Sequence, residues 1–180
     1  MEKVRELDSA GAEGGKVEAV FWVKEVMTQW RVRGRAFVLG EGGEMEEAKR
    51  RQVRGWMRRT VGGDNGEDGW SWDREITAHF GNLSPLMRGS FRNPPPGTPV
   101  SEPLKNLDWG LGQKVEELRD EVARENFRVV VIRPEEVEQV DLSDPSRGRR
   151  WKWSFVGSPL GSDTKVDGVL GEWKVEELWP

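Results

Sequence analysis

The chain has 180 residues and a net charge of −4, and 33% of its residues are charged, against about 25% in a typical globular protein. This acidic balance argues against a general nucleic-acid binder. The absence of cysteine excludes disulfides, thiolate metal sites and cysteine nucleophiles, and a single histidine, His79, excludes a multi-histidine metal site. No apolar run approaches the ~20 residues of a membrane helix, and the acidic start is unlike a signal peptide, so we expect a cytoplasmic protein.

Ten tryptophans and no tyrosine make the aromatic composition unusual. One interpretation is core packing in a chain of biased composition, in which arginine also outnumbers lysine. The other is stacking on a planar ligand, for which indole offers a flat apolar surface and one donor.

Two strands are predicted near the N-terminus. Val17–Lys24 is rich in β-branched and aromatic residues, and Gln29–Leu39 alternates apolar and polar residues. The short link between them favours an antiparallel pair. The alternation predicts an apolar face and a polar face, which are formed by Trp30, Val32, Gly34, Ala36 and Val38, and by Gln29, Arg31, Arg33 and Arg35.

A charged, glycine-rich insertion is expected at about residues 41–72. Glu44–Val61 has acids early and bases late, as a helix prefers, and Gly62–Gly69 has the composition of a loop. The basic residues of Lys49–Arg59 are interpreted either as a phosphate-binding patch or as a solvated helix face balanced by the preceding glutamates. We expect this insertion to lie outside the main fold.

Two further helical segments are predicted in the middle of the chain. Asp73–Phe91 resembles a helix that Asp73 caps and Pro85 interrupts, with apolar residues at helical spacing. These residues are Ile76, Phe80, Leu83 and Met87. Gln113–Asn126 resembles an amphipathic helix whose inward residues are Val115, Leu118 and Val122.

The C-terminal third is predicted to be mostly strand. Phe127–Ile132 is the most strand-like run, Pro134 should end it, and Val137–Leu142 resumes it. Arg150–Val156 and Trp173–Leu178 alternate as two more strands. Without a parallel βαβ rhythm, five or six strands with inserted helices indicate an antiparallel sheet or barrel.

The three arginines at 31, 33 and 35 are the most informative polar feature. Like charges in one row repel each other unless an anionic ligand or acidic segments of the protein neutralise them, and the sequence leaves these two possibilities open. His79 and Ser84 are poorly spaced for a nucleophile–base pair, which favours a surface or packing role for His79.

Several segments resemble a known family. T-Q-W-R-V-R-G at 28–34 resembles the R-Q-V-R-V-E-G strand of pyridoxamine 5′-phosphate oxidases, and W-K-V-E-E-L-W-P at 173–180 resembles their closing W-x-x-x-R-L-x-P. Residues 82–97 and 123–142 are similar to segments of the related FMN-binding proteins, in the same order. The resemblance implies a mostly β fold with inserted helices, an antiparallel split β-barrel forming a single domain over residues 1–180. It also implies an FMN-dependent oxidoreductase of unassigned substrate, with FMN at the interface of a homodimer.

The resemblance also implies roles for individual residues. Gln29 matches the strand glutamine that contacts the flavin, and Arg150 matches the arginine near the flavin ring. Ser84 and Lys3 match residues that contact the FMN phosphate. Arg88 matches a family arginine for which we expect a structural role. No residue is identified as a catalytic base.

The chain departs from the family at three places. The substrate motif R-L-H-D has no counterpart in 137–144, and Glu177 replaces the arginine before the closing L-x-P. The family's strands upstream of Lys3 are missing here, so we expect an N-terminally truncated barrel. This leaves two alternatives to an enzyme: a non-enzymatic remnant or dimerisation module without FMN, and an adaptor that binds acidic proteins through Lys49–Arg59.

Overall fold

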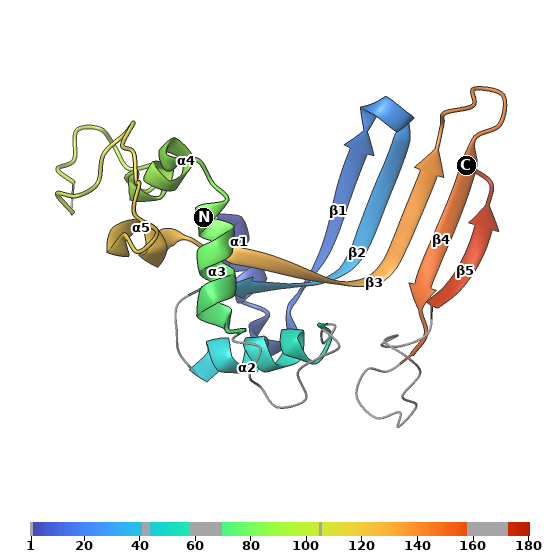
Figure 1. Cartoon of the computed structure of the whole chain (residues 1–180), viewed down its shortest axis with the longest axis horizontal. Coiled ribbons are helices and arrows are strands. Elements are labelled where there is room, and N and C mark those ends of the chain that lie inside the picture. Colours follow the sequence, from blue (N-terminus) through green and yellow to red (C-terminus); the bar gives the residue numbers. More distant parts are fainter. Residues whose placement is uncertain (1, 41–43, 58–69, 105, 158–172) are drawn as a thin grey trace.

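A computed structural model describes residues 2–40, 44–57, 70–104, 106–157 and 173–180 (Figure 1). Five strands form one antiparallel sheet in the order β1-β2-β3-β4-β5. They are β1 (Gly15–Val23), β2 (Thr28–Leu39), β3 (Val129–Asp141), β4 (Arg149–Phe155) and β5 (Trp173–Leu178). Among the described residues the sheet is open, with β1 and β5 at its edges. The predicted antiparallel β fold with inserted helices is thus confirmed.

The α-helices gather at one end of the long β2–β3 pair, and β1, β4 and β5 flank its other end (Figure 1). The α-helices are α1 (Glu2–Asp8), α2 (Glu44–Arg54), α3 (Trp72–Gly81), α4 (Pro85–Gly89) and α5 (Glu121–Asn126). Short 3-10 helices are η1 (Gly11–Glu13), η2 (Lys24–Val26) and η3 (Ser90–Arg92). In the part of the chain that the structure describes, no helix is long and apolar enough to cross a membrane.

The buried core lies at the helical end and has two parts. One packs α3 and α5 together through Ile76, Phe80, Val115, Ala123 and Phe127. The other joins β2 to α2 through Phe37, Leu39 and Val53. Burial of these side chains is the main stabilising contribution in this half of the molecule.

Pro134 does not end a strand as the sequence predicts. β3 continues through it, and the register with β2 shifts between Arg33 and Gly34, so that Gly34 pairs with Pro134. A β-bulge tolerates proline because one ladder hydrogen bond is already missing there. The strands approach closely at this point: a Cβ on Gly34 would lie 2.0 Å from the carbonyl oxygen of Arg133.

Two helix predictions are corrected. Ser71, and not Asp73, caps α3: its Oγ accepts a hydrogen bond from the backbone N–H of Arg74 at 3.2 Å. Of the apolar residues that the sequence places at helical spacing, Ile76 and Phe80 are buried and Met87 is exposed.

The helix predicted over 113–126 is limited to α5, and Leu118 is exposed. The backbone before it bonds to α4 and its flanks instead: the N–H of Val115 donates to the carbonyl of Pro85 at 3.0 Å. The guanidinium of Arg88 donates a hydrogen bond to the carbonyl of Val115 at 2.8 Å. These tertiary bonds replace the helical ones.

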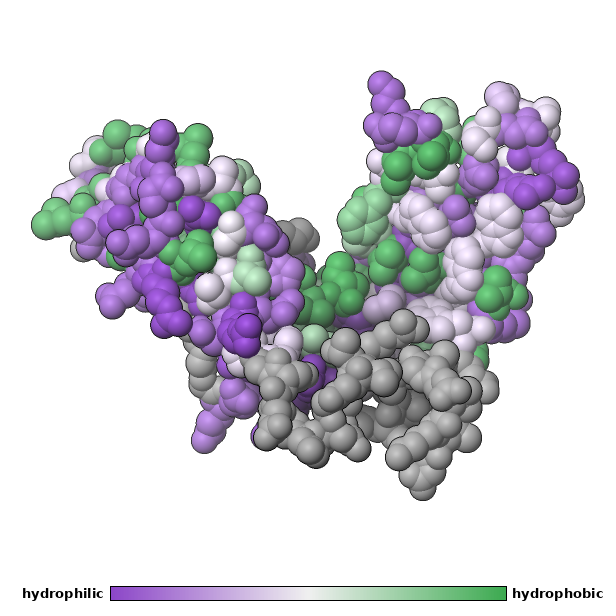
Figure 2. Space-filling view, viewed as in Figure 1, coloured by the Kyte–Doolittle hydropathy of each residue, from purple (hydrophilic) through white to green (hydrophobic). Residues whose placement is uncertain are grey.

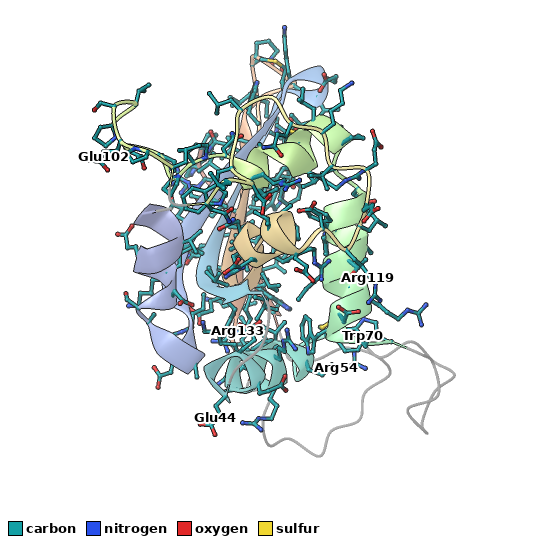
Figure 3. The ribbon with its side chains drawn as sticks, turned by 90° about the vertical axis from the view of Figure 1, so that its left-hand side faces the viewer. Glu44, Arg54, Trp70, Glu102, Arg119 and Arg133 are labelled. Carbon is teal, nitrogen blue, oxygen red and sulfur yellow. The ribbon has the colours of Figure 1, made fainter. Side chains whose placement is uncertain are left out.

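The described part of the 41–72 insertion packs against the fold. α2 buries Val53, and the carboxylate of Glu46 accepts from the backbone N–H of Gly40 at 2.8 Å. At its end, Arg54 lies over the ring of Trp70 at 4.1 Å (Figure 3). α2 is therefore not an excursion into solvent. Gly62–Gly69 lies outside the described residues, and the boundaries of the insertion and domain stay predictions.

Candidate functional site

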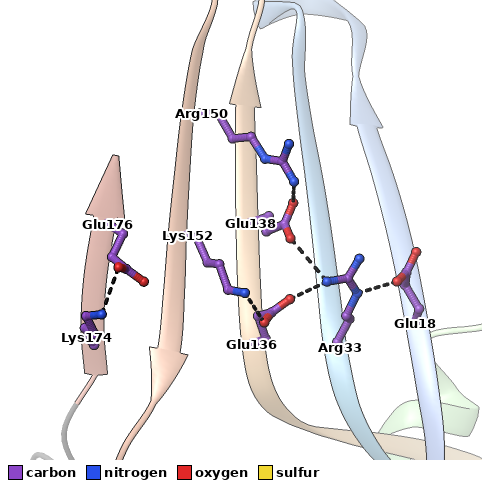
Figure 4. A network of polar contacts seen from close by, with 8 residues as sticks. All are labelled: Glu18, Arg33, Glu136, Glu138, Arg150, Lys152, Lys174 and Glu176. Atoms are coloured by element: carbon purple, nitrogen blue, oxygen red, sulfur yellow. Dashed lines mark hydrogen bonds and ion pairs between the residues drawn. The ribbon is translucent and has the colours of Figure 1, made fainter. Parts of the chain in front are cut away.

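The outer half of the sheet carries charged side chains on one face (Figure 4). The pairing of the strands places Gln29, Val140 and Arg150 in one row across β2, β3 and β4. The next rows are Arg31–Glu138–Lys152 and Glu18–Arg33–Glu136. Directly paired residues share a face of the sheet. We call this surface the charged face, formed by Glu18, Gln29, Arg31, Arg33, Glu136, Glu138, Val140, Arg150 and Lys152.

The carboxylates of the charged face lie between cations. Arg33 Nε is 2.5 Å from Glu18 and its Nη1 is 3.2 Å from Glu138; the same Nη1 also contacts Glu136. Glu136 binds Lys152 at 2.5 Å. Glu138, which is only 5% exposed, accepts from Arg150 Nη2 at 2.6 Å. One connected network thus joins four strands.

The arginine row is neutralised by the protein's own acids. Arg33 is paired as described, Arg31 lies 3.5 Å from Glu18, and Arg35 lies 3.3 Å from Glu135. The sequence left open whether an anionic ligand or acidic segments of the protein neutralise this row. The structure supports the acidic segments.

The ion pairs also fix the protonation of the network. A hydrogen bond from Arg33 lowers the pKa of Glu18. Hydrogen bonds from Lys152 and, with a smaller effect, from Arg33 lower the pKa of Glu136. The same contacts to Glu18 and Glu136 raise the pKa of Arg33. These groups stay charged at neutral pH because the charged forms stabilise one another.

Gln29 and Arg150, predicted to contact a flavin, are brought together on the charged face. They flank Val140, and both are partly buried. Among the described residues, Nε of Arg150 is buried without a hydrogen-bond acceptor. Nε of Arg31, in the next row, lies 3.5 Å from Glu18 and is paired with it. A buried donor without an acceptor is costly, so Arg150 together with the Gln29 amide offers polar groups that fit a heteroaromatic or anionic ligand.

Ser84 and Lys3, predicted to contact the phosphate, lie elsewhere. Ser84 is the N-cap of α4, where its Oγ accepts a hydrogen bond from the backbone N–H of Met87 at 3.3 Å. α4 lies at the helical end, far from the outer ends of β2–β4 (Figure 1). Lys3 is in α1, and its side chain lies outside the described part. One chain therefore does not join Ser84 to Gln29 and Arg150, and the binding roles of all four residues stay predictions.

Arg88 has the expected structural role. It is 6% exposed, and its guanidinium donates to the carbonyls of Leu83 at 2.7 Å and Val115 at 2.8 Å, and to two more at longer range. It thereby ties α4 to the segment before α5.

The other candidates from the sequence lie outside this row. His79 is exposed, 3.4 Å from Glu75 on the same helix. In the basic segment, Lys49 is buried against Asp8, and Arg50 pairs with Glu46 at 3.3 Å. The described part of this segment is thus partly neutralised and partly buried, which weakens its interpretation as a phosphate patch, while Arg58 and Arg59 lie outside the described residues.

Sequence reasoning missed Glu138, which holds both Arg33 and Arg150. The alternation of Glu136, Glu138 and Val140 was the available signal, because it places these residues on one face of a strand. Sequence reasoning also did not predict how much of the opposite face of the sheet remains exposed to solvent.

That face, which we call the indole face, is formed by Phe21, Trp30, Val32, Val137, Trp151, Trp153, Phe155, Trp173 and Val175. Trp30 and Trp153 stack with ring centroids 5.9 Å apart. Figure 2 shows this side of the outer sheet lined mainly by weakly polar and apolar residues. Phe21 and Val175 remain 54% and 55% exposed.

Comparisons with known proteins agree with the resemblance. Residues 1–40 match the family model described as "Pyridoxamine 5′-phosphate oxidase, FMN-binding domain". An uncharacterized protein of Saccharomyces cerevisiae, YGR017W, is 28% identical over 109 residues, which is 60% of this chain and 31% of the yeast protein. The chain thus spans about a third of the length of this relative.

A solved structure shares the fold. The crystal structure of a pyridoxamine 5′-phosphate oxidase-related, FMN binding protein from Nostoc punctiforme PCC 73102 superimposes with a TM-score of 0.56 at 14% identity, covering 100% of this chain and 69% of the other. In its first 40 residues by sequence, and over its whole length by fold, the chain is similar to the pyridoxamine 5′-phosphate oxidase-related FMN-binding proteins.

Proposed function

We propose that this chain binds FMN on the charged face, as a flavin-dependent oxidoreductase of unassigned substrate that works as a homodimer. The observation that carries the proposal is the row Gln29–Val140–Arg150, in which the buried Nε of Arg150 has no hydrogen-bond acceptor among the described residues. The charged face has four cations and three carboxylates, a net charge of +1 in a chain of net charge −4. The family match over residues 1–40 supports the choice of FMN.

The residues of the row have distinct tasks in this proposal. The Gln29 amide both donates and accepts, which suits the polar edge of a flavin ring. Arg150 Nε supplies a donor that stabilises negative charge when the ring is reduced. Glu138 holds the other end of that guanidinium at 2.6 Å and so fixes its direction. When bound, FMN itself supplies the hydride-transfer chemistry.

The phosphate end of the ligand requires a second copy of the chain. Ser84 lies at the helical end, away from Gln29 and Arg150 within one chain. A dimer that places the α4 N-terminus of one copy at the charged face of the other would bring both parts to one ligand. This separation is the reason for including a homodimer in the proposal.

The proposal is tested by titrating FMN against the purified chain and following flavin fluorescence quenching. Gln29→Ala and Arg150→Ala should each weaken binding about ten- to hundredfold, the loss expected for one hydrogen bond to a charged group. Arg149→Ala is the matched control, because Arg149 is the next residue on β4 and faces the opposite side of the sheet. No quenching with the parent chain, or equal losses in all three variants, would overturn the proposal.

A second function is favoured by a different observation. The arginine row is already paired with Glu18, Glu135, Glu136 and Glu138, so the charged face is stable without an added anion. This supports a non-enzymatic dimerisation module that no longer holds FMN. The absorption spectrum of the purified protein separates the two functions, because flavin bands are expected only from the first.

A further inference from the structure

A row of three cations crosses the sheet directly inward of the bulge. Lys16 of β1 is opposite Arg35 of β2, which in turn is opposite Arg133 of β3. In the neighbouring row of the charged face, Arg33 instead has a glutamate opposite it on each side (Figure 4). Like charges directly opposite one another destabilise paired strands. This row therefore costs stability that the alternation of charges in the neighbouring row avoids.

The bulge itself creates the row. In the register that holds outward of the bulge, Pro134 would be opposite Arg35. The shift brings Arg133 opposite Arg35 and leaves Glu135 without a partner on β2. Bulges redirect side chains and are common next to functional sites. We call Lys16, Arg35, Arg133 and Glu135 together the bulge site.

The two arginines of the bulge site converge on one oxygen atom. Oε1 of Glu135 accepts hydrogen bonds from Arg35 Nε at 3.3 Å and from Arg133 Nη2 at 3.0 Å. The side chain of Glu135 is 44% exposed, whereas those of Arg35 and Arg133 are 29% and 18% exposed. The acceptor is thus more exposed than either donor, and another acceptor can replace it without opening the fold.

Arg133 has a donor edge of which only half is used. Its guanidinium lies 4.6 Å from the ring centroid of Trp56 and 5.8 Å from that of Phe37, which fixes its orientation. Nη2 binds Glu135, but Nε is buried without an acceptor among the described residues. Nε and Nη2 lie on one edge of the guanidinium and together suit two oxygens of one anion. The single oxygen of Glu135 leaves this edge half unsatisfied, which is costly.

The charge of the bulge site selects the class of ligand. Three cations and one carboxylate give it a net charge of +2. Lys16 is exposed, and in the described part of the chain no acid is paired with it. A phosphate group carries a charge of about −1.5 to −2 at neutral pH and has several strong acceptor oxygens, so it matches both the charge and the donors.

We propose that the bulge site binds the phosphate group of a small ligand, which displaces the carboxylate of Glu135. The phosphate oxygens accept from Nε and Nη2 of Arg133 and from Nε of Arg35, and Lys16 adds its charge from β1. Gln29 of the flavin row lies about 20 Å away along β2, so the two sites are separate. The inference depends neither on FMN nor on the homodimer of the proposed function.

The sharpest test removes the internal competitor. Inorganic phosphate is titrated into the full chain and followed by calorimetry, with the ionic strength held constant by sodium chloride. Glu135→Gln keeps the size of the side chain but removes its charge, so phosphate should bind about three- to fivefold more tightly, the value of one partly exposed ion pair. Unfolding would lower the affinity and cannot produce this gain.

Substitution of the cations should have the opposite effect. Arg35→Gln and Arg133→Gln should each weaken phosphate binding at least about tenfold. Arg133→Lys should weaken it nearly as much, because lysine keeps the charge but not the two-donor edge. Lys24→Gln is the control, since it removes the same charge from an exposed residue beyond the other end of β1 and should change the affinity less than about twofold. Circular dichroism shows whether each variant is folded.

Three results would overturn the inference: no phosphate binding by the parent chain and Glu135→Gln, an affinity that Glu135→Gln leaves unchanged or lowers, or a loss in Lys24→Gln as large as in the arginine variants. Arg133→Gln should quench FMN fluorescence as the parent chain does. If this variant lost FMN and phosphate together, the cations would serve the phosphate of the flavin, and a separate site would be rejected. Intact phosphate binding without FMN binding would reject the flavin proposal alone.

Discussion

The β2–β3 pair is one ladder with two different surroundings. In its inner half, Ala36, Phe37, Val38 and Leu39 are each at most 4% exposed. In its outer half, the charged face and the indole face both remain partly open, and none of the described α-helices packs on this part of the sheet (Figure 1). The change occurs at the bulge where Gly34 pairs with Pro134.

The two halves are therefore held by different interactions. Burial of apolar side chains stabilises the inner half, at about 25 cal/mol per Å². Ion pairs and the stacked Trp30–Trp153 rings hold the outer half, and partly exposed ion pairs contribute little each. Substitutions in the inner half should consequently affect folding, while those in the outer half should mainly affect binding and assembly.

The largest difference is expected between Phe37→Ala and Trp30→Ala. Phe37 is 1% exposed and packs in the cluster with Leu39 and Val53, so its truncation should cost about 3–5 kcal/mol. Trp30 is only partly buried, and its truncation should cost less than half as much. Urea unfolding of both variants measures this. Equal costs would show that the outer half is as well covered in solution as the inner half.

The bulge between the halves is tested by Gly34→Ala. A Cβ at this position would lie 2.0 Å from the Arg133 carbonyl oxygen, so the two strands must separate, at about 2–3 kcal/mol of stability. Gly81→Ala is the control, since its Cβ would only meet the Leu118 side chain at 3.6 Å. A Gly34 variant as stable as the Gly81 variant would show that the bulge can move along the strands.

The strands were largely predictable because their signal is local. Alternation located β2, and Trp173–Leu178 was placed with its observed bounds. The continuity of β3 was not predictable, because the proline signal for a break is also local, whereas the bulge that tolerates Pro134 depends on Gly34 in another strand. The helix predicted before α5 was wrong for the same reason. Arg88, which is distant in sequence, donates hydrogen bonds to the carbonyls of Val115 and Glu116 in this segment.

The candidate site was predictable only in part. The resemblance selected Gln29 and Arg150, but their common row depends on the register of β3 against both neighbours. A shift of one residue in the register of β3 against β2 would have placed Val140 on the other face of the sheet from Gln29. The separation of Ser84 from this row follows from tertiary packing of α4, for which the sequence carries no local signal.

Within the outer half, Glu138→Gln should have the largest effect on stability. Glu138 is the most buried carboxylate of the charged face and binds both Arg33 and Arg150, so losing its charge should cost about 1.5–3 kcal/mol. Glu135→Gln, an exposed partner of Arg35, should cost less than about 1 kcal/mol. Thermal unfolding of the two variants provides the comparison. If Glu138→Gln were neutral, the network would not stabilise the outer half.

The smallest effect expected is the pH dependence that Glu136 contributes. Hydrogen bonds from Lys152 and Arg33 lower its pKa in the folded state below the ordinary 4.5, so its ionised form stabilises the fold. This contribution is complete above pH 4.5 and is lost as the pH falls through the lowered folded-state pKa. Because the side chain is partly exposed, it amounts to less than about 1 kcal/mol. The stability difference between the parent chain and Glu136→Gln, measured by urea unfolding, should shrink from pH 7 to pH 3. Lys152→Gln should reduce the same pH dependence, since Lys152 is the main cause of the lowered pKa. A difference that stayed constant over this range would mean that these ion pairs do not form in solution, and that the outer half depends on the indole face alone.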